Sequence, residues 1–222
     1  MPALTPGGPR SDIDSIRAEA LSCVKCRLAQ GRTQVVWADG NLESDLLFIG
    51  EAPGFHEDQQ GLPFVGAAGQ LLDNLLREIG LDRTAAAIVN VIKCRPPGNR
   101  DPMADEIEAC RPYLEAQLAH MAPRVIVTLG NFATRFVLEQ EIGISRARGH
   151  KYRRLGATVV PTFHPAAALR GGRFGGTSPI DALRSDFQVV KALLEEQPAP
   201  RTEGALETAA ARAADTEQLG LF

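Results

Sequence analysis

Residues 46–66 read LLFIGEAPGFHEDQQGLPFVG. The apolar run at residues 46–49 ends in glycine and proline, which is typical of a buried strand that opens into a loop. Residues 67–76 follow with the apolar spacing of a helix. In open α/β sheets, ligands bind where such loops leave the carboxyl ends of strands. The loop is much longer than an ordinary strand-to-helix connection, so we interpret it as a ligand-binding loop, with an ordinary connection as the alternative.

Three more apolar runs have the length of buried strands, and amphipathic segments separate them. The predicted strands are residues 45–50, 87–92, 124–130 and 158–163, and the predicted helices are residues 11–21, 68–79, 101–121, 131–140 and 180–196. Strands that alternate with helices predict an α/β fold, with helices on both faces of a parallel sheet. The loops after these strands should meet at one edge of the sheet.

The 222-residue chain is long enough for one α/β domain and a tail. We expect a flexible N-terminus at residues 1–10, a main domain at residues 11–197 and a flexible tail at residues 198–222, where proline, alanine, glutamate and threonine dominate. No secretory signal is recognisable, and no apolar run has membrane-spanning length. We therefore expect a cytoplasmic protein without membrane contact.

The formal net charge is −3, but the charges are unevenly distributed. Residues 145–180 contain no acidic residue. A local patch of one sign matters more than the net charge when the partner is a phosphate backbone. We predict phosphate contacts for Arg146, Arg148, Lys151, Arg153, Arg154 and Arg170. A solvated basic face is the alternative.

Four cysteines are present, two of them as the C-x2-C pair Cys23 and Cys26. Cys94 and Cys110 lie far away in the sequence, on either side of a proline-rich loop. Four thiolates can hold one metal centre in a cytosolic protein. The spacing leaves zinc and an iron–sulfur cluster open, with a weak preference for the cluster, and unrelated buried thiols are a further alternative.

Taken together, these features resemble the family 4 uracil-DNA glycosylases, the iron–sulfur branch of the uracil-DNA glycosylase superfamily. The resemblance covers roughly residues 22–195 and rests on four motifs in order, with the cysteines in place. The motifs are GEAPG at residues 50–54, GLPFVG at 61–66, NVIKCRPPGNR at 90–100 and TFHPAAAL at 162–169. It implies a three-layer α/β/α sandwich around a four-stranded parallel sheet. The resemblance also implies a structural 4Fe-4S cluster that the four cysteines bind. It further implies that residues 11–197 form the catalytic domain.

The implied function is DNA repair: uracil is flipped out of single- or double-stranded DNA and its glycosidic bond is hydrolysed. By resemblance, His164 donates a hydrogen bond to uracil O2, Asn90 reads the base edge and Phe64 stacks on the ring. A core histidine, a strand-end asparagine that caps the backbone and a core phenylalanine are the alternatives.

Residues 50–57 hold further candidate site residues. Another branch of the superfamily has an aspartate at the position of Ala52 and a blocking tyrosine at the position of Gly54. Glu51 is a candidate to replace that aspartate in catalysis, and Glu57 matches the position that crowds uracil C5 and excludes thymine. Solvated carboxylates are the alternative for both glutamates.

Two further contacts with partners are expected. Leu169, beside Arg170, is the candidate to wedge into the gap that the flipped base leaves. The tail ends in QLGLF and resembles the peptide by which bacterial proteins bind the sliding clamp. Its clamp-binding residues would be Gln218, Leu219, Leu221 and Phe222. Chance apolar residues at a terminus are the alternative. We expect a nucleoid-associated monomer.

Two other functions are alternatives. One is a non-catalytic iron–sulfur protein that binds nucleic acid on the same fold. The other is a relative that covalently traps its product. That branch is expected to differ from family 4 at the position of Ala52 and in the region after Cys94, and this chain differs at neither.

Overall fold

The computed structural model of the chain describes residues 13–171, 176 and 178–196. The expectations for residues 1–10 and for the clamp-binding tail at residues 198–222 lie outside these described residues. Among the described residues, no helix has the length and apolar character that crossing a membrane requires.

Within the described residues, the sheet has six strands in the order β1-β3-β2-β4-β6-β5. The four central strands are parallel and coincide with the four predicted apolar runs. They are β2 (Leu46–Gly50), β3 (Ala87–Asn90), β4 (Val125–Leu129) and β6 (Ala157–Thr162). Nearly all of their residues are buried, as expected for strands that helices cover on both faces.

The prediction of a purely parallel, four-stranded sheet is wrong in detail, because the sheet is mixed. β1 (Asp39–Gly40) pairs antiparallel with β3 at one edge. β5 (Tyr152–Arg154) pairs antiparallel with β6 at the other edge. Both edge strands are short and largely polar, which suits an edge but leaves no apolar run in the sequence to mark them.

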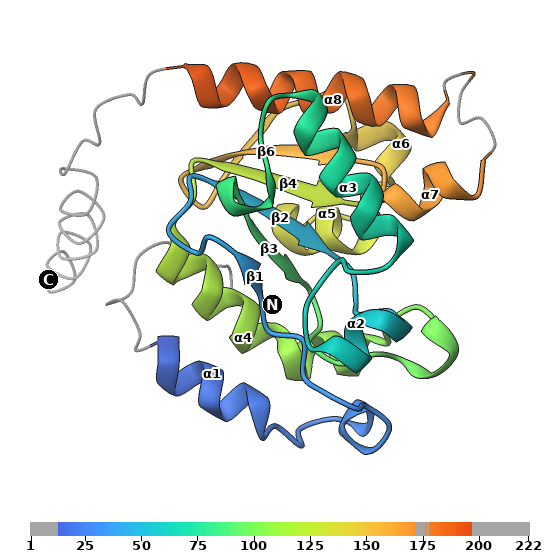
Figure 1. Ribbon diagram of the computed structural model, residues 1–222. Helices are drawn as coiled ribbons and strands as arrows, with labels where there is room; N and C mark the ends of the chain where they lie inside the picture. The colour runs from blue at the N-terminus through green and yellow to red at the C-terminus, as the bar shows by residue number, and fades with distance from the viewer. Residues whose placement is uncertain (1–12, 172–175, 177, 197–222) are drawn as a thin grey trace, which may run out of the picture.

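Helices cover both faces of the sheet and produce three layers (Figure 1). One face carries α1 (Ile13–Leu21), α4 (Ala104–Met121) and α5 (Asn131–Leu138), and the other carries α3 (Ala67–Glu78) and α8 (Pro179–Glu195). Short helices in the connections were not predicted: α2 (Phe55–Gln60), α6 (Ile144–Ala147), α7 (Pro165–Leu169), and the 3-10 turns η1 (Arg27–Gln30), η2 (Arg83–Ala85) and η3 (Pro97–Asn99).

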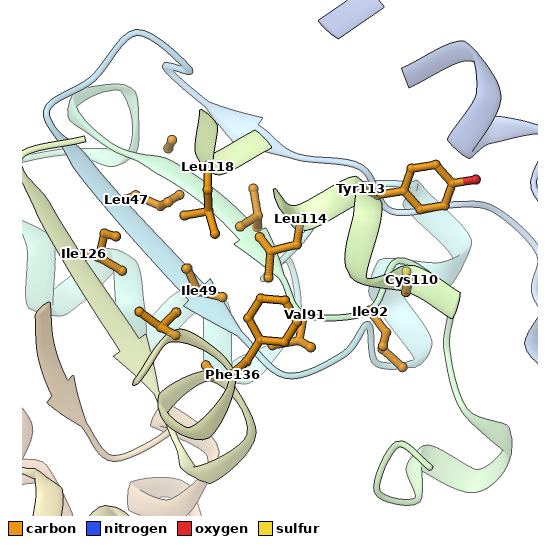
Figure 2. Close-up of a cluster of buried hydrophobic side chains, with 14 of the residues drawn as sticks. Leu47, Ile49, Val91, Ile92, Cys110, Tyr113, Leu114, Leu118, Ile126 and Phe136 are labelled. Carbon is orange, nitrogen blue, oxygen red and sulfur yellow. The ribbon is translucent and has the colours of Figure 1, made fainter. Parts of the chain in front are cut away.

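Successive residues of a strand point to opposite faces, so β2 contributes to two separate cores. Leu47 and Ile49 pack with Leu114 of α4 and Phe136 of α5 (Figure 2). Phe48 faces the other way and stacks on Phe187 of α8, with the ring centroids 5.6 Å apart. The two cores fix the parallel strands in register, and this register brings the loops that follow the strands together.

Candidate functional site

A pocket of about 360 Å³ opens at the carboxyl ends of β2, β3 and β6. Its walls come from the loops that follow these strands, which are distant in the sequence. Eight of the predicted site residues line it: Glu51, Ala52, Gly54, Glu57, Phe64, Asn90, His164 and Arg170. The parallel register therefore brings the sequence-derived candidates to one place.

Gly50 is a point where three segments lie in close contact. It pairs with Asn90 in the parallel register of β2 and β3. A Cβ atom at position 50 would lie 2.4 Å from Asn90 Oδ1 and 2.6 Å from the Phe64 ring. Only glycine leaves room for both side chains against the end of the strand.

Phe64 is buried at the pocket wall, and its backbone has a left-handed conformation with φ of 55°. A bulky residue with positive φ is a strained conformation that the surroundings must impose. Arg83 helps to impose it by donating hydrogen bonds to the carbonyl oxygens of Phe64, at 3.1 Å, and of Pro63. Gly69 lets α3 pack closely against the backbone of Phe64, since a Cβ atom at position 69 would lie 1.7 Å from the Phe64 carbonyl oxygen.

The side chain of Asn90 is 1% exposed, and its Oδ1 atom has no hydrogen-bond partner within the described part of the chain. Its backbone carbonyl accepts a hydrogen bond of 2.7 Å from Lys93 Nζ, which also donates to Gln117 Oε1 at 2.5 Å. Burial lowers the pKa of Lys93 to about 8. A buried, unpaired amide oxygen at a pocket wall is an acceptor that a ligand can satisfy.

His164 follows β6 and forms the N-cap of α7, where its Nδ1 atom accepts a 3.2 Å hydrogen bond from the backbone N–H of Ala166. A neutral imidazole that accepts at Nδ1 carries its proton on Nε2. Burial, helped by Arg170 and opposed by Glu57, lowers the pKa of His164 to about 4. The ring therefore stays neutral at pH 7, with one N–H donor. It lies nearly parallel to Phe64, with the centroids 5.5 Å apart.

Two glutamates of the pocket have different environments. Glu57 Oε1 accepts hydrogen bonds from the backbone N–H groups of Val65 and Gly66, at 2.9 and 2.8 Å, so its carboxylate is held in place. Burial raises the pKa of Glu51 to about 7, and the negative charge of Asp101 adds to the shift, whereas Arg170 opposes it. A carboxyl group that titrates near neutral pH can accept a proton during a reaction.

Sequence reasoning missed Arg83 and Asp101, both of which shape this site. Arg83 also binds Asp39 and Asp73, at 2.5 and 3.0 Å, and so joins β1 and α3 to the loop that carries Phe64. Asp101, in the loop between β3 and α4, lines the same pocket as Glu51, and its charge acts on that carboxyl group. Neither residue belongs to a local pattern in the sequence.

The predicted phosphate-contacting residues separate into two groups. Two of the arginines bind acidic residues: Arg148 contacts the buried Asp186 at 3.1 Å, and Arg154 contacts Glu139 at 2.5 Å. Asp186 also accepts a 2.6 Å hydrogen bond from Thr162, two residues before His164. Asp186 therefore ties α8 to the end of β6 through Thr162, and to the end of α6 through Arg148.

The remaining basic residues are exposed. Arg146, Lys151 and Arg153 point outward, and Arg153 pairs with Thr158 at the start of β6, the end of the strand opposite the pocket. Leu169 is 53% exposed at the end of α7, next to Arg170 in the pocket rim. Of the predicted DNA contacts, Leu169 and Arg170 are thus the ones that the fold places beside the pocket.

All four cysteines line one small cavity of about 20 Å³ beside α1, η1, α4 and the loop after β3. Figure 2 shows Cys110 on α4, near Ile92. Three sulfur atoms accept hydrogen bonds: Cys94 from Arg32 at 3.4 Å, Cys110 from the Lys93 N–H at 3.2 Å and Cys23 from the Lys25 N–H at 3.5 Å. Among the described residues, no three His, Cys, Asp or Glu side chains form a group that could hold a single metal ion.

The amino-acid sequence of the chain is similar to those of a known protein family. Residues 37–188 match the model of the uracil DNA glycosylase superfamily. A type-4 uracil-DNA glycosylase of Sulfurisphaera tokodaii is 47% identical over 166 residues, which are 71% of this chain and 76% of the relative. Those of Saccharolobus solfataricus and Thermotoga maritima are 42% and 44% identical, over 84% and 72% of this chain and 88% and 85% of the relatives. The chain belongs to the uracil-DNA glycosylase superfamily and, within it, groups with the type-4 uracil-DNA glycosylases.

Proposed function

We propose that this protein excises uracil from DNA by hydrolysing the N-glycosidic bond, which releases free uracil and leaves an abasic site for base excision repair. The observation that carries the proposal is the pairing, in one pocket, of a neutral histidine donor with an unsatisfied amide acceptor. The names of its relatives, type-4 uracil-DNA glycosylases, support the same activity.

The reaction makes two demands on the pocket. A base inside a duplex is inaccessible, so uracil must be flipped out before it can enter. Cleavage of the bond between uracil N1 and deoxyribose C1′ passes through an oxocarbenium-like sugar and leaves a uracil anion. Donors placed where this negative charge develops lower the barrier, because they are already oriented in a site from which water is largely excluded.

His164 is positioned to be that donor. Its Nδ1 atom is engaged with Ala166, so the remaining N–H group on Nε2 can reach uracil O2. A neutral donor suits the task, since a buried imidazolium would require a proton that burial disfavours. We therefore assign stabilisation of the leaving uracil to His164.

Asn90 and Phe64 would select the base. The unpaired Oδ1 of Asn90 can accept the uracil N3–H, and its amide nitrogen can donate to O4. Cytosine presents the opposite pattern at these positions and would leave the buried amide unsatisfied. The Phe64 ring offers a stacking surface worth about 1–3 kcal/mol per base.

Glu57 and Glu51 receive separate roles. Glu57 is held by two backbone N–H groups and approaches Gly54, where a Cβ atom would lie 2.7 Å from its Oε2 atom. We assign it to the side of the pocket that crowds uracil C5. Ala52 offers no carboxylate, so we assign Glu51 to orient the attacking water and accept its proton.

The first test removes the two groups that contact the base. We expect His164→Ala to slow uracil release by about 10²–10³-fold, because one preorganised donor to the developing anion is lost. We expect Asn90→Ala to slow it by at least about tenfold, since one hydrogen bond to a buried group contributes about 1–3 kcal/mol. Release is measured on uracil-containing oligonucleotides, single- and double-stranded.

Val189→Ala is the matched control, because Val189 is exposed on α8 away from the pocket. Unchanged release in both site variants would refute these assignments. An absence of release by the wild type would favour the non-catalytic, DNA-binding alternative.

The second test uses pH. Glu51 must be ionised to accept a proton, and its pKa is raised to about 7, so we expect kcat/KM to increase with pH through about 7 and then level off. His164, with a pKa near 4, remains neutral over this range and adds no change. Glu51→Gln should remove the increase, and a profile with the same increase in this variant would contradict the role of Glu51.

We further propose that the four cysteines hold a 4Fe-4S cluster. Their convergence on one cavity supports it, as do the N–H donors to three of the sulfur atoms. In such a cluster each of the four thiolates would bind a different iron atom. When bound, the cluster would cross-link the N-terminal segment to the loop after β3.

The third test measures this cofactor. Purified protein should contain about four iron and four sulfide per chain and show the broad visible absorbance of such clusters. Cys110→Ser should lose iron and sulfide, whereas Ser22→Ala, next to Cys23, should retain both. Zinc in place of iron and sulfide would contradict the cluster.

Contact with DNA would begin at the rim of the pocket. We propose that Leu169 enters the gap left by the flipped uracil while Arg170 contacts a phosphate. Arg146, Lys151 and Arg153 are exposed and would contribute to binding that depends on salt but not on sequence. Arg148 and Arg154 would first have to leave Asp186 and Glu139.

The fourth test concerns the tail, for which the sequence motif is the only support. We propose that Gln218, Leu219, Leu221 and Phe222 dock in a hydrophobic groove of a bacterial sliding clamp, so that a monomeric, cytoplasmic enzyme works at the nucleoid. Deleting residues 218–222 should abolish co-elution with the clamp and leave uracil release from free oligonucleotides intact. Clamp binding that survives the deletion would refute the motif.

A further inference from the structure

An aromatic side chain stands exposed at the rim of the uracil pocket. Phe55 is the first residue of α2, between Gly54 and Glu57, which both line the pocket. Its side chain is 51% exposed, although most large apolar side chains of this chain are buried. An exposed aromatic ring beside a concave site offers a face on which a nucleic-acid base can stack.

A positive charge accompanies the ring. The guanidinium carbon of Arg95 lies 5.0 Å from the centroid of Phe55, within the range of a cation–π contact. Arg95 Nε also donates a 2.7 Å hydrogen bond to Asn99 Oδ1, and Asn99 lines the pocket. These contacts join α2 to the η3 loop and hold Phe55 and Arg95 together at the rim.

A second segment at the pocket carries the same combination. Leu169 is exposed at the end of α7, and Arg170 follows it in the pocket wall. Both α2 and α7 lie at the end of the sheet to which the central strands point (Figure 1). A DNA strand whose uracil enters the pocket would therefore find an apolar side chain and an arginine at both of these segments.

We propose that Phe55 and Arg95 form a stacking platform for the nucleotide next to the flipped uracil, and that the platform serves single-stranded DNA above all. The inference rests on the proposed function. An unpaired base next to the uracil loses its stacking neighbour when the uracil flips, and an aromatic side chain can replace that neighbour. In a duplex, the adjacent base remains paired and stacked on its other side, so it gains less from the platform. Arg95 can contact the phosphate of the same nucleotide.

The test compares Phe55 variants on single- and double-stranded oligonucleotides with one uracil. We expect Phe55→Ala and Phe55→Leu to raise KM on single strands about tenfold, which corresponds to about 1.4 kcal/mol, with kcat changed less than about twofold. On duplexes the increase should stay below about threefold. Phe55→Trp should remain close to wild type, because stacking needs a ring and not merely an apolar surface.

Val189→Ala again serves as the control for the loss of an exposed apolar side chain, and thermal unfolding checks that each variant folds. An unchanged KM for Phe55→Ala on single strands would overturn the proposal. So would an equal loss on single strands and duplexes, or a Leu variant that performs as well as the Trp variant.

A second measurement locates the stacked base. Single strands carry an abasic spacer on the 5′ or the 3′ side of the uracil, and binding is followed by fluorescence anisotropy. We expect the spacer on one of these two sides, and not on the other, to weaken binding to wild type about tenfold. The same spacer should leave binding to Phe55→Ala nearly unaffected. Equal effects on both proteins would overturn the platform. Binding is measured directly and does not depend on uracil release. A wild type that releases no uracil would therefore refute the proposed function, while the comparison of wild type with Phe55→Ala would still test the platform.

Discussion

The close approach of β2, β3 and the 61–66 loop at Gly50 is the constraint on which the pocket depends. The parallel register places Gly50 beside Asn90, and the missing side chain lets the Phe64 ring reach the same point. Each neighbour is then held from behind: Phe64 by Arg83 and by the close contact with Gly69, and Asn90 by its buried position in the strand. The wall formed by Phe64 and Asn90 is therefore held by buried contacts within the protein, as the proposed selection of one base over another requires.

A second set of buried polar groups supports the histidine side of the pocket. Asp186 of α8 binds both Arg148 and Thr162, close to the residue that carries the proposed N–H donor. Removing Arg148 would leave the buried Asp186 charge without its cation. The ion pair holds α8 against the end of α6, and the hydrogen bond from Thr162 holds α8 against the end of β6. On the opposite face, Lys93 connects the Asn90 backbone to Gln117 of α4 and lies next to two of the cysteines. Lys93 thus connects the cysteine cavity to the end of β3 that carries Asn90.

The sequence predicted the four central strands and the long helices well, because buried parallel strands are continuous apolar runs and amphipathic helices keep a clear period. It missed β1 and β5, which are two and three residues long and polar. It also missed α2, whose residues FHEDQQ show no apolar stripe. The basic segment was treated as one phosphate-binding surface, yet Arg148 turns inward to Asp186. Local charge cannot reveal such a partner, because the partner lies 38 residues away in the sequence.

By itself, the sequence determined the fold class, the motifs that carry the family resemblance and the identities of eight residues that line the pocket. These features depend on local patterns, namely apolar periodicity, glycine and proline at loops, and residue types in fixed order. The tertiary structure alone decided the state of those residues. It set the tautomer of His164, the raised pKa of Glu51, the unpaired oxygen of Asn90 and the exposure of Phe55. Each of these depends on burial and on neighbours from other loops, which exist only after the strands have paired.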